Sequence, residues 1–403
     1  MKASFFKTLR TTLLNALWMM LITFPIMVIK VKPRESLVSW RWMNLLWVGI
    51  GTFSLSWIWR YLLSRRDKGS KLNAGRGREV LGLLWGKKKI RAVLLAALAL
   101  LVIWFPWMVN LYQVGIITSG LMFVILGLGL NIVIGYGGLL HLGYAAFYAM
   151  GAYNYALMYL YWGMQFWLAL PLGAVSGALF GILIGFPVLR LRGDYLAIVT
   201  LAFGEIMRLL LLNLSDFTKG AEGIAQIPRA AFIRALSLQE ATNYLFYICV
   251  VLVVFSIFII RRLENSRIGR ALEAMREDEI AAQSMGINLT RNKLITFALG
   301  AFWAGLAGVI LAAKTTYINP GSFTLLESVM ILVAVVLGGM GSIPGVILGA
   351  LLVTLIPEYF RALSDYRMLM FGVVLVIMPI FRPRGIIPKL RKHYTVKEVD
   401  CSS

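Results

Sequence analysis

Two oppositely charged residues interrupt a predominantly apolar stretch of this chain, residues 195–213. Glu205 and Arg208 stand three positions apart there. That spacing places both side chains on one face of a helix, where they can form an ion pair. Each charge alone would cost about 2.5–3.5 kcal/mol at the centre of a membrane-inserted helix, so the two either pair or face water. The pattern favours a structural ion pair, and it leaves open a gate, a substrate path or a proton relay.

A second group of polar side chains lies in a glycine-rich segment, residues 127–155. Glycine at this density weakens a regular helix. In a membrane, irregular backbone persists only where it is buried in protein or lines a water-filled cavity. We therefore expect this segment to form the wall of a polar pathway, with a tight helical hairpin around residues 136–139 as the alternative. The candidate pathway residues of both segments are Asn131, Tyr136, His141, Tyr144, Asn154, Glu205 and Arg208.

A polar stretch between two apolar runs, residues 261–293, carries a third pattern. Its apolar side chains recur on one helical face, with Glu279 intruding. Asn265 or Ser266 suits the N-cap and Gly286 suits the position after the C-terminus, so we predict one amphipathic helix over residues 266–286. It could lie on the membrane surface, but we favour a docking helix for a soluble partner. The residues expected to serve docking are Leu272, Glu273, Ala274, Met275, Glu277, Asp278, Glu279, Ala281, Ala282 and Gly286.

The sequence lacks the signatures of common catalytic sites. It has no GxxxxGK[ST] loop to hold ATP phosphates, and no HExxH, CxxC or GxSxG motif. The two histidines, His141 and His393, are far apart in the chain. We therefore predict no catalytic residue, no metal site and no cofactor bound by this chain, which makes an enzyme improbable.

The composition indicates the elements that must hold these residues. The 403 residues are 60% hydrophobic and 14% charged, whereas soluble domains are about 45–50% apolar and about 25% charged. A helix needs about 20 apolar residues to cross a bilayer. We expect an all-α polytopic membrane protein with about 10–12 transmembrane helices, and re-entrant segments are the alternative to full spans for the short runs 325–340, 345–360 and 366–381. The candidate spans are 13–29, 43–63, 92–111, 116–134, 139–162, 166–189, 195–213, 243–260, 294–313, 325–340, 345–360 and 366–381.

Basic residues outnumber acidic ones, 40 Lys and Arg against 18 Asp and Glu. In a soluble protein this excess would suggest nucleic acid. Here the basic residues gather in alternate segments between spans, so we read them as the positive-inside rule and predict cytoplasmic termini and no nucleic-acid partner. Anionic membrane lipid is a minor expected partner. The basic segments are 1–12, 64–91, 190–194, 261–293 and 382–403.

The chain divides by pattern into three parts. Residues 1–91 form an N-terminal extension with two transmembrane helices and a basic cytoplasmic linker, residues 92–388 form the membrane domain, and residues 389–403 form a cytoplasmic tail. Within the membrane domain, glycines at every fourth position from Gly173 to Gly185 form a flat stripe on one helix. The stripe predicts either close packing within one subunit or an interface that moves during transport.

Several segments together resemble the branched-chain amino acid ABC permease family over roughly residues 115–388. The predicted docking helix is similar to the coupling segment of ABC importer permeases, whose loose signature is Glu-Ala-Ala-x3-Gly, although Ile280 stands where that signature has glutamate. The two extra N-terminal spans resemble the longer type of permease in the family. The segments that carry the resemblance are 127–131, 135–147, 189–205, 269–278, 337–345 and 381–386.

The resemblance implies a subunit of a heteromeric importer in a bacterial inner membrane. Its partners would be a second related permease, two cytoplasmic ATPase subunits that hold ATP and Mg, and a periplasmic substrate-binding protein. The implied substrates are leucine, isoleucine and valine, and the helix at 266–286 would receive the movement of the ATPases. A permease for urea or short amides is the nearest alternative, and an ion-coupled secondary carrier is a more distant one.

Overall fold

The computed structural model describes residues 29–32, 37–40, 104–188, 191, 193–230, 237–359, 372 and 385–388. The chain divides into two compact units, Met1–Leu101 and Val102–Ser403. In the first unit, strands β1 (Ile29–Lys32) and β2 (Leu37–Trp40) form an antiparallel hairpin with Ile29 opposite Trp40, which the all-α prediction did not include. The basic linker, the C-terminal tail and the predicted spans 13–29, 43–63, 92–111 and 366–381 lie wholly or largely outside the described residues.

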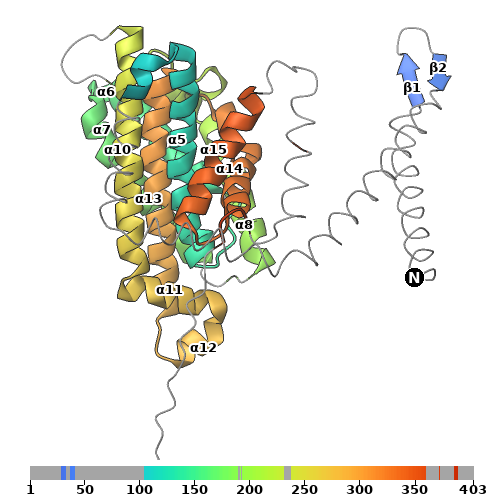
Figure 1. Ribbon diagram of the computed structural model, residues 1–403, viewed down its shortest axis with the longest axis vertical. Coiled ribbons are helices and arrows are strands. Elements are labelled where there is room, and N and C mark those ends of the chain that lie inside the picture. Colours follow the sequence, from blue (N-terminus) through green and yellow to red (C-terminus); the bar gives the residue numbers. More distant parts are fainter. Residues whose placement is uncertain are drawn as a thin grey trace, which may run out of the picture. The chain divides into compact units, whose positions relative to one another are not determined.

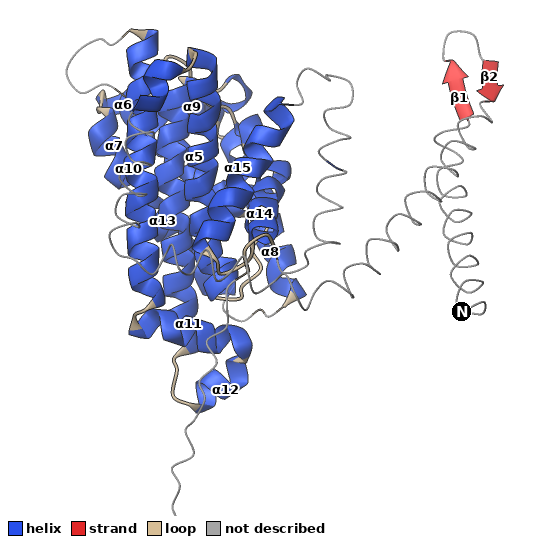
Figure 2. Cartoon of the chain, viewed as in Figure 1, coloured by secondary structure: helices blue, strands red, loops and turns tan. Residues whose placement is uncertain are grey.

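The second unit is a bundle of helices, and the part of it that the structure describes confirms a polytopic all-α membrane protein (Figures 1 and 2). Within the described ranges, six helical segments are long and apolar enough to cross a membrane: Leu111–Tyr136, Phe166–Val188, Asp194–Asn213, Leu238–Glu264, Leu289–Thr315 and Pro320–Gly338. The elements in chain order are α5 (Leu111–Asn131), the π-helix η1 (Ile132–Tyr136), α6 (Tyr144–Trp162), α7 (Phe166–Val188), α8 (Asp194–Asn213), α9 (Ser215–Thr218), η2 (Gly220–Glu222), α10 (Leu238–Glu264), α11 (Arg267–Glu277), α12 (Glu279–Ser284), α13 (Leu289–Thr315), η3 (Pro320–Ser322), α14 (Leu325–Gly338) and α15 (Ile343–Tyr359).

Helix α13 packs against α5, α6 and α7, and most of its side chains beyond the first turn are buried. The glycine stripe of α7 brings its backbone close to that of α13. A Cβ atom added at Gly177 would lie 2.5 Å from the carbonyl oxygen of Ala301, and one at Gly181 would lie 2.7 Å from that of Phe297. Small residues let membrane helices approach to backbone contact, where dispersion contacts and weak hydrogen bonds accumulate. The predicted packing within one subunit is therefore confirmed for this stripe.

The glycine-rich segment departs from regular helix, as its composition predicted. Helix α5 ends in the π-helix η1, and the chain then runs without regular structure over residues 137–143 before α6 begins at Tyr144. The predicted span 139–162 is therefore helical only from Tyr144, and the proposed tight helical hairpin is absent. Leu139 and His141 are buried among the helices, so the irregular backbone is shielded by protein, as a membrane environment requires.

Candidate functional site

Helices α11 and α12 lie at one end of the bundle, beyond the ends of α10 and α13 (Figure 1). The Oγ atom of Ser266 accepts a hydrogen bond of 3.1 Å from the Gly269 N–H and so begins α11. Asp278 then adopts an extended conformation, with φ −157°, and its Oδ1 accepts bonds of 2.8 and 3.0 Å from the N–H groups of Ile280 and Ala281. The prediction of one helix over 266–286 was therefore wrong, because Asp278 ends α11 and caps α12.

The physical reason for this break is the preference of aspartate for the N-cap position, where its carboxylate bonds to free N–H groups. The predicted end of the segment is confirmed: Gly286 follows α12 with φ +82°, a conformation that glycine adopts without strain. The two short helices can therefore point in different directions, which a single helix could not.

The predicted apolar face of this region is turned toward the chain itself. Leu272, Met275 and Ala282 are buried, so these three side chains pack against the bundle and are not available for docking. Glu279, the acidic residue that intrudes on this face, forms an ion pair of 2.7 Å with Lys293 of α13. The Lys293 side chain is only 5% exposed. This ion pair fixes α12 to the first turns of α13.

The opposite face of α11 and α12 is open to solvent. Of the residues predicted for docking, Glu273, Glu277, Asp278, Ala281 and Gly286 are exposed, Ala274 and Glu279 are half-buried. Two further residues stand out on this surface: the side chains of Ile280 and Met285 are 66% and 83% exposed. Neither was among the residues predicted for docking, although apolar side chains outside the buried stripe of an amphipathic segment were the available signal.

Arg276, near the end of α11, contacts another element of the bundle. Its Nη1 donates a hydrogen bond to the carbonyl oxygen of Gly135 in η1. Its aliphatic stem lies against Gly138, where a Cβ atom would come within 2.8 Å of the Arg276 Cγ. A cation at the C-terminal end of a helix interacts favourably with the helix dipole. Arg276 therefore joins α11 to the end of α5 and η1.

Four of the predicted pathway residues, Asn131, Tyr136, His141 and Tyr144, are buried in the bundle. The hydroxyl of Tyr144 donates a bond of 2.8 Å to the carbonyl oxygen of Gly300, and Asn131 Oδ1 accepts one of 2.8 Å from the N–H of Gly341. These contacts hold the irregular segment in place, and in this conformation no solute could touch the four side chains. Asn154 of α6 is half-buried. A pathway role for these residues stays a prediction.

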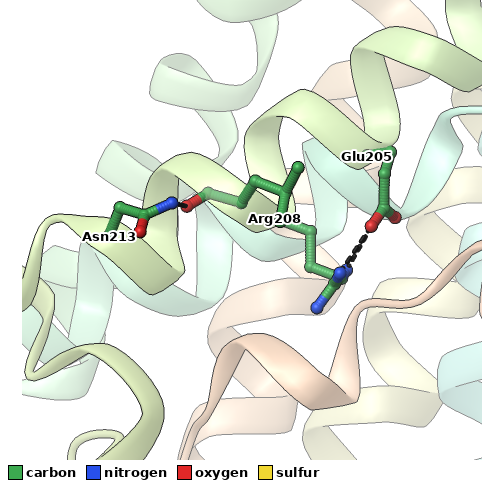
Figure 3. A network of polar contacts seen from close by, with 4 residues as sticks. Glu205, Arg208 and Asn213 are labelled. Carbon is green, nitrogen blue, oxygen red and sulfur yellow. Dashed lines mark hydrogen bonds and ion pairs between the residues drawn. The ribbon is translucent and has the colours of Figure 1, made fainter.

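The predicted ion pair on α8 is present (Figure 3). Arg208 Nε donates a bond of 2.9 Å to Glu205 Oε1. The two side chains are 25% and 42% exposed, with Arg208 the more buried. Because unsolvated charge is costly in lipid, this half-exposed pair requires water or a second protein on its open side. Within the described ranges, no three His, Cys, Asp or Glu side chains come together as a metal site would require.

The chain is similar in sequence to known transport permeases. The family model described as branched-chain amino acid transport system, permease component, matches residues 112–379. The high-affinity branched-chain amino acid transport system permease protein LivM of Escherichia coli (strain K12) is 42% identical over 378 residues, which cover 89% of this chain and 88% of LivM. The LivH permease protein of the same organism is 26% identical over 301 residues, covering 68% of this chain and 95% of LivH.

A more distant relative is the probable branched-chain amino acid transport permease protein LivM of Methanocaldococcus jannaschii, which is 27% identical over 238 residues, 55% of this chain and 68% of that protein. No solved structure matches the chain significantly. The family model and the extent of the match to LivM agree with the bundle of apolar helices. The chain therefore belongs to the family of branched-chain amino acid transport permeases and is of the LivM type.

Proposed function

We propose that this chain is one membrane-spanning subunit of an ATP-driven importer for leucine, isoleucine and valine in a bacterial inner membrane. Its relatives LivM and LivH are both named as permease proteins of high-affinity branched-chain amino acid transport systems. Because nearly the whole length of LivH aligns with this chain, a second permease of similar fold is the natural partner. Two ATPase subunits and a periplasmic substrate-binding protein would complete the machine.

The observation that carries the proposal is the exposed surface of α11 and α12. Ile280 and Met285 present apolar side chains to solvent beside the acidic residues Glu277 and Asp278. Exposed apolar groups bordered by charges are typical of a protein interface. The sequence contains no GxxxxGK[ST] loop for ATP phosphates, so in this proposal the energy for transport comes from a partner that holds ATP and Mg. We define these four residues as the tip surface.

In this mechanism the ATPases close on ATP and push the tip surface. The permease pair then changes between inward-open and outward-open arrangements, and ATP and the loaded binding protein both shift that equilibrium by binding one arrangement more tightly. The binding protein would carry most of the substrate selectivity. The permease would supply the passage, with the open side of the Glu205–Arg208 pair facing it or facing the second permease.

The test is uptake by proteoliposomes that contain this chain with its genomic neighbours, the second permease, the ATPases and the binding protein. We expect ATP-dependent leucine uptake that disappears when any one partner is omitted. The double variant Ile280→Asp with Met285→Asp should lower co-purification of the ATPases by about tenfold or more, because hot-spot side chains contribute 2 kcal/mol or more. Gln283→Asp, which adds a charge to the same exposed helix, is the matched control and should leave the complex intact.

The two alternatives give different results in the same vesicles. A permease for urea or short amides would take up urea and not leucine. An ion-coupled carrier would accumulate solute when this chain is present alone with an ion gradient and no ATP. Either outcome would contradict the proposed function.

A further inference from the structure

The π-helix η1, which continues α5, is held by a residue from the helix pair that carries the tip surface. Carbonyl groups in the last turn of a helix have no partner within the helix. At Gly135 that role falls to Arg276, whose Nη1 donates to the carbonyl oxygen. The two residues are 141 positions apart in the chain, so the bond joins separate elements and is not a local cap.

Arg276 is exposed to solvent overall, but the stem of its side chain lies against Gly138. Gly138 has φ +69°, and a Cβ atom there would meet the Cγ, Cβ and Cα atoms of Arg276 at 2.8, 3.1 and 3.2 Å. At the other end of α11, a Cβ at Gly269 would lie 2.1 Å from the carbonyl oxygen of Leu263, so α11 also packs tightly on the end of α10. Helix α11 is thus in close contact with its neighbours at both ends, through Gly269 at the end of α10 and through Arg276 at η1, so a displacement of α11 would act on η1 through the Arg276 bond.

Gly135 has a second neighbour on its other side. A Cβ atom at Gly135 would lie 2.1 Å from Asn131 Oδ1 and 2.6 Å from the backbone nitrogen of Gly341. The same Asn131 oxygen accepts a 2.8 Å bond from the Gly341 N–H, and Gly341 belongs to the turn between α14 and α15. Gly135 is therefore wedged between Arg276 and the α14–α15 turn.

The end of α14, which leads into that turn, is hydrogen-bonded to a later segment of the chain. The N–H groups of Ile386 and Ile387 donate bonds of 2.9 and 3.1 Å to the carbonyl oxygens of Leu337 and Gly338. The Arg276–Gly135 hydrogen bond and the close contacts of Gly135 with Asn131 and Gly341 thus connect α11 to α5 and to the turn between α14 and α15. The connecting element is a π-helix, a local irregularity that is frequent at functional sites.

We infer that Arg276 is the positioning residue that carries movement of the tip surface into the membrane helices, through Gly135 and Asn131 to the α14–α15 turn. The inference rests on the proposed function, because it needs a motor that acts on α11. It is separate from docking: Arg276 holds the permease's own helices, while Ile280 and Met285 contact the motor. Loss of Arg276 should therefore leave the complex assembled but uncouple it.

The experiment measures leucine transported per ATP hydrolysed in proteoliposomes of the full complex, normalised to assembled complex. Arg276→Ala should keep co-purification of the ATPases and ATP hydrolysis near the wild-type values and lower the transport ratio about tenfold, within the 5–150-fold range of typical coupling. Arg276→Lys, which keeps a donor, should restore part of the ratio. Arg270→Ala is the matched control, because Arg270 lies on the same helix and, within the part of the chain that the structure describes, its guanidinium bonds to the nearby Asn265 carbonyl oxygen alone.

The route through Asn131 is tested by a double-variant cycle. Asn131→Ala should lower the transport ratio as well, and the combination with Arg276→Ala should lower it little further, because both changes break one connection. Equal transport ratios for Arg276→Ala and Arg270→Ala would overturn the inference while leaving the proposed function intact. A complex that fails to assemble with either Ala or Lys at position 276 would also overturn it, because Arg276 would then maintain the fold alone. Absence of ATP-dependent uptake in the wild type would instead refute the proposed function.

Discussion

The close approach of α7 to α13 makes a prediction whose sign can be worked out from the structure. Replacing a glycine inside a helix with alanine stabilises the helix by about 1 kcal/mol when space allows. At Gly177 the new Cβ would lie 2.5 Å from the Ala301 carbonyl oxygen, against 3.4–4 Å for ordinary contact. Relieving an overlap of that size against backbone costs about 1–3 kcal/mol. The cost of relieving the overlap equals or exceeds the stabilisation that alanine brings to the helix, so we expect Gly177→Ala to be neutral or destabilising.

Gly115 provides the control for this prediction. It also lies within a membrane helix, α5, but no neighbouring atom of the described residues lies within 4 Å of its added Cβ. Gly115→Ala should therefore stabilise the protein, and the two variants should differ by about 1–3 kcal/mol. The assay is the apparent melting temperature in detergent, read as the monodisperse fraction after stepwise heating. A Gly177→Ala protein as stable as Gly115→Ala would show that α7 does not pack on α13 by backbone contact.

Three further predictions concern the charged and polar residues. Glu279→Lys should destabilise the protein by about 3–5 kcal/mol, because it leaves the buried Lys293 amine without its carboxylate. The double variant Glu279→Lys with Lys293→Glu should recover most of the loss in melting temperature. Glu205→Leu should lower the amount of membrane-inserted protein, since Arg208 would remain unpaired. Insertion should return when the two charges are exchanged between positions 205 and 208. Unchanged insertion of Glu205→Leu would show that water alone satisfies Arg208. Tyr144→Phe should cost about 0.5–1.5 kcal/mol of stability by removing one buried hydrogen bond, and the variant should retain uptake. Normal stability with lost uptake would instead favour a pathway role for Tyr144.

Much of the fold follows from short-range features of the sequence. The long apolar runs predicted the membrane helices that the structure describes, because crossing the bilayer sets a length and a composition that any isolated segment must satisfy. The glycine stripe of α7 predicted a close helix contact, because the spacing of glycines along one helix is enough to show which of its faces lacks side chains. The irregular segment after Tyr136 and the Gly286 terminus were likewise readable from glycine alone.

The candidate site could be predicted only in part. The pattern around residues 266–286 identified the right surface, yet it did not show that Leu272 and Met275 face the chain itself. An amphipathic helix has one apolar face, and periodicity cannot tell whether a partner or the same chain covers it. The break at Asp278 was missed because the helical pattern of apolar residues continues past it.

The sequence by itself predicted the six described helices that are long and apolar enough to cross a membrane, the close packing of the glycine stripe and the segment that protrudes. Only the tertiary structure decided how that segment is connected to the rest. Arg276 meets Gly135, and Asn131 meets Gly341, across 141 and 210 positions of the chain. Such bonds depend on the relative placement of several packed helices, and no local pattern of residue types encodes that placement.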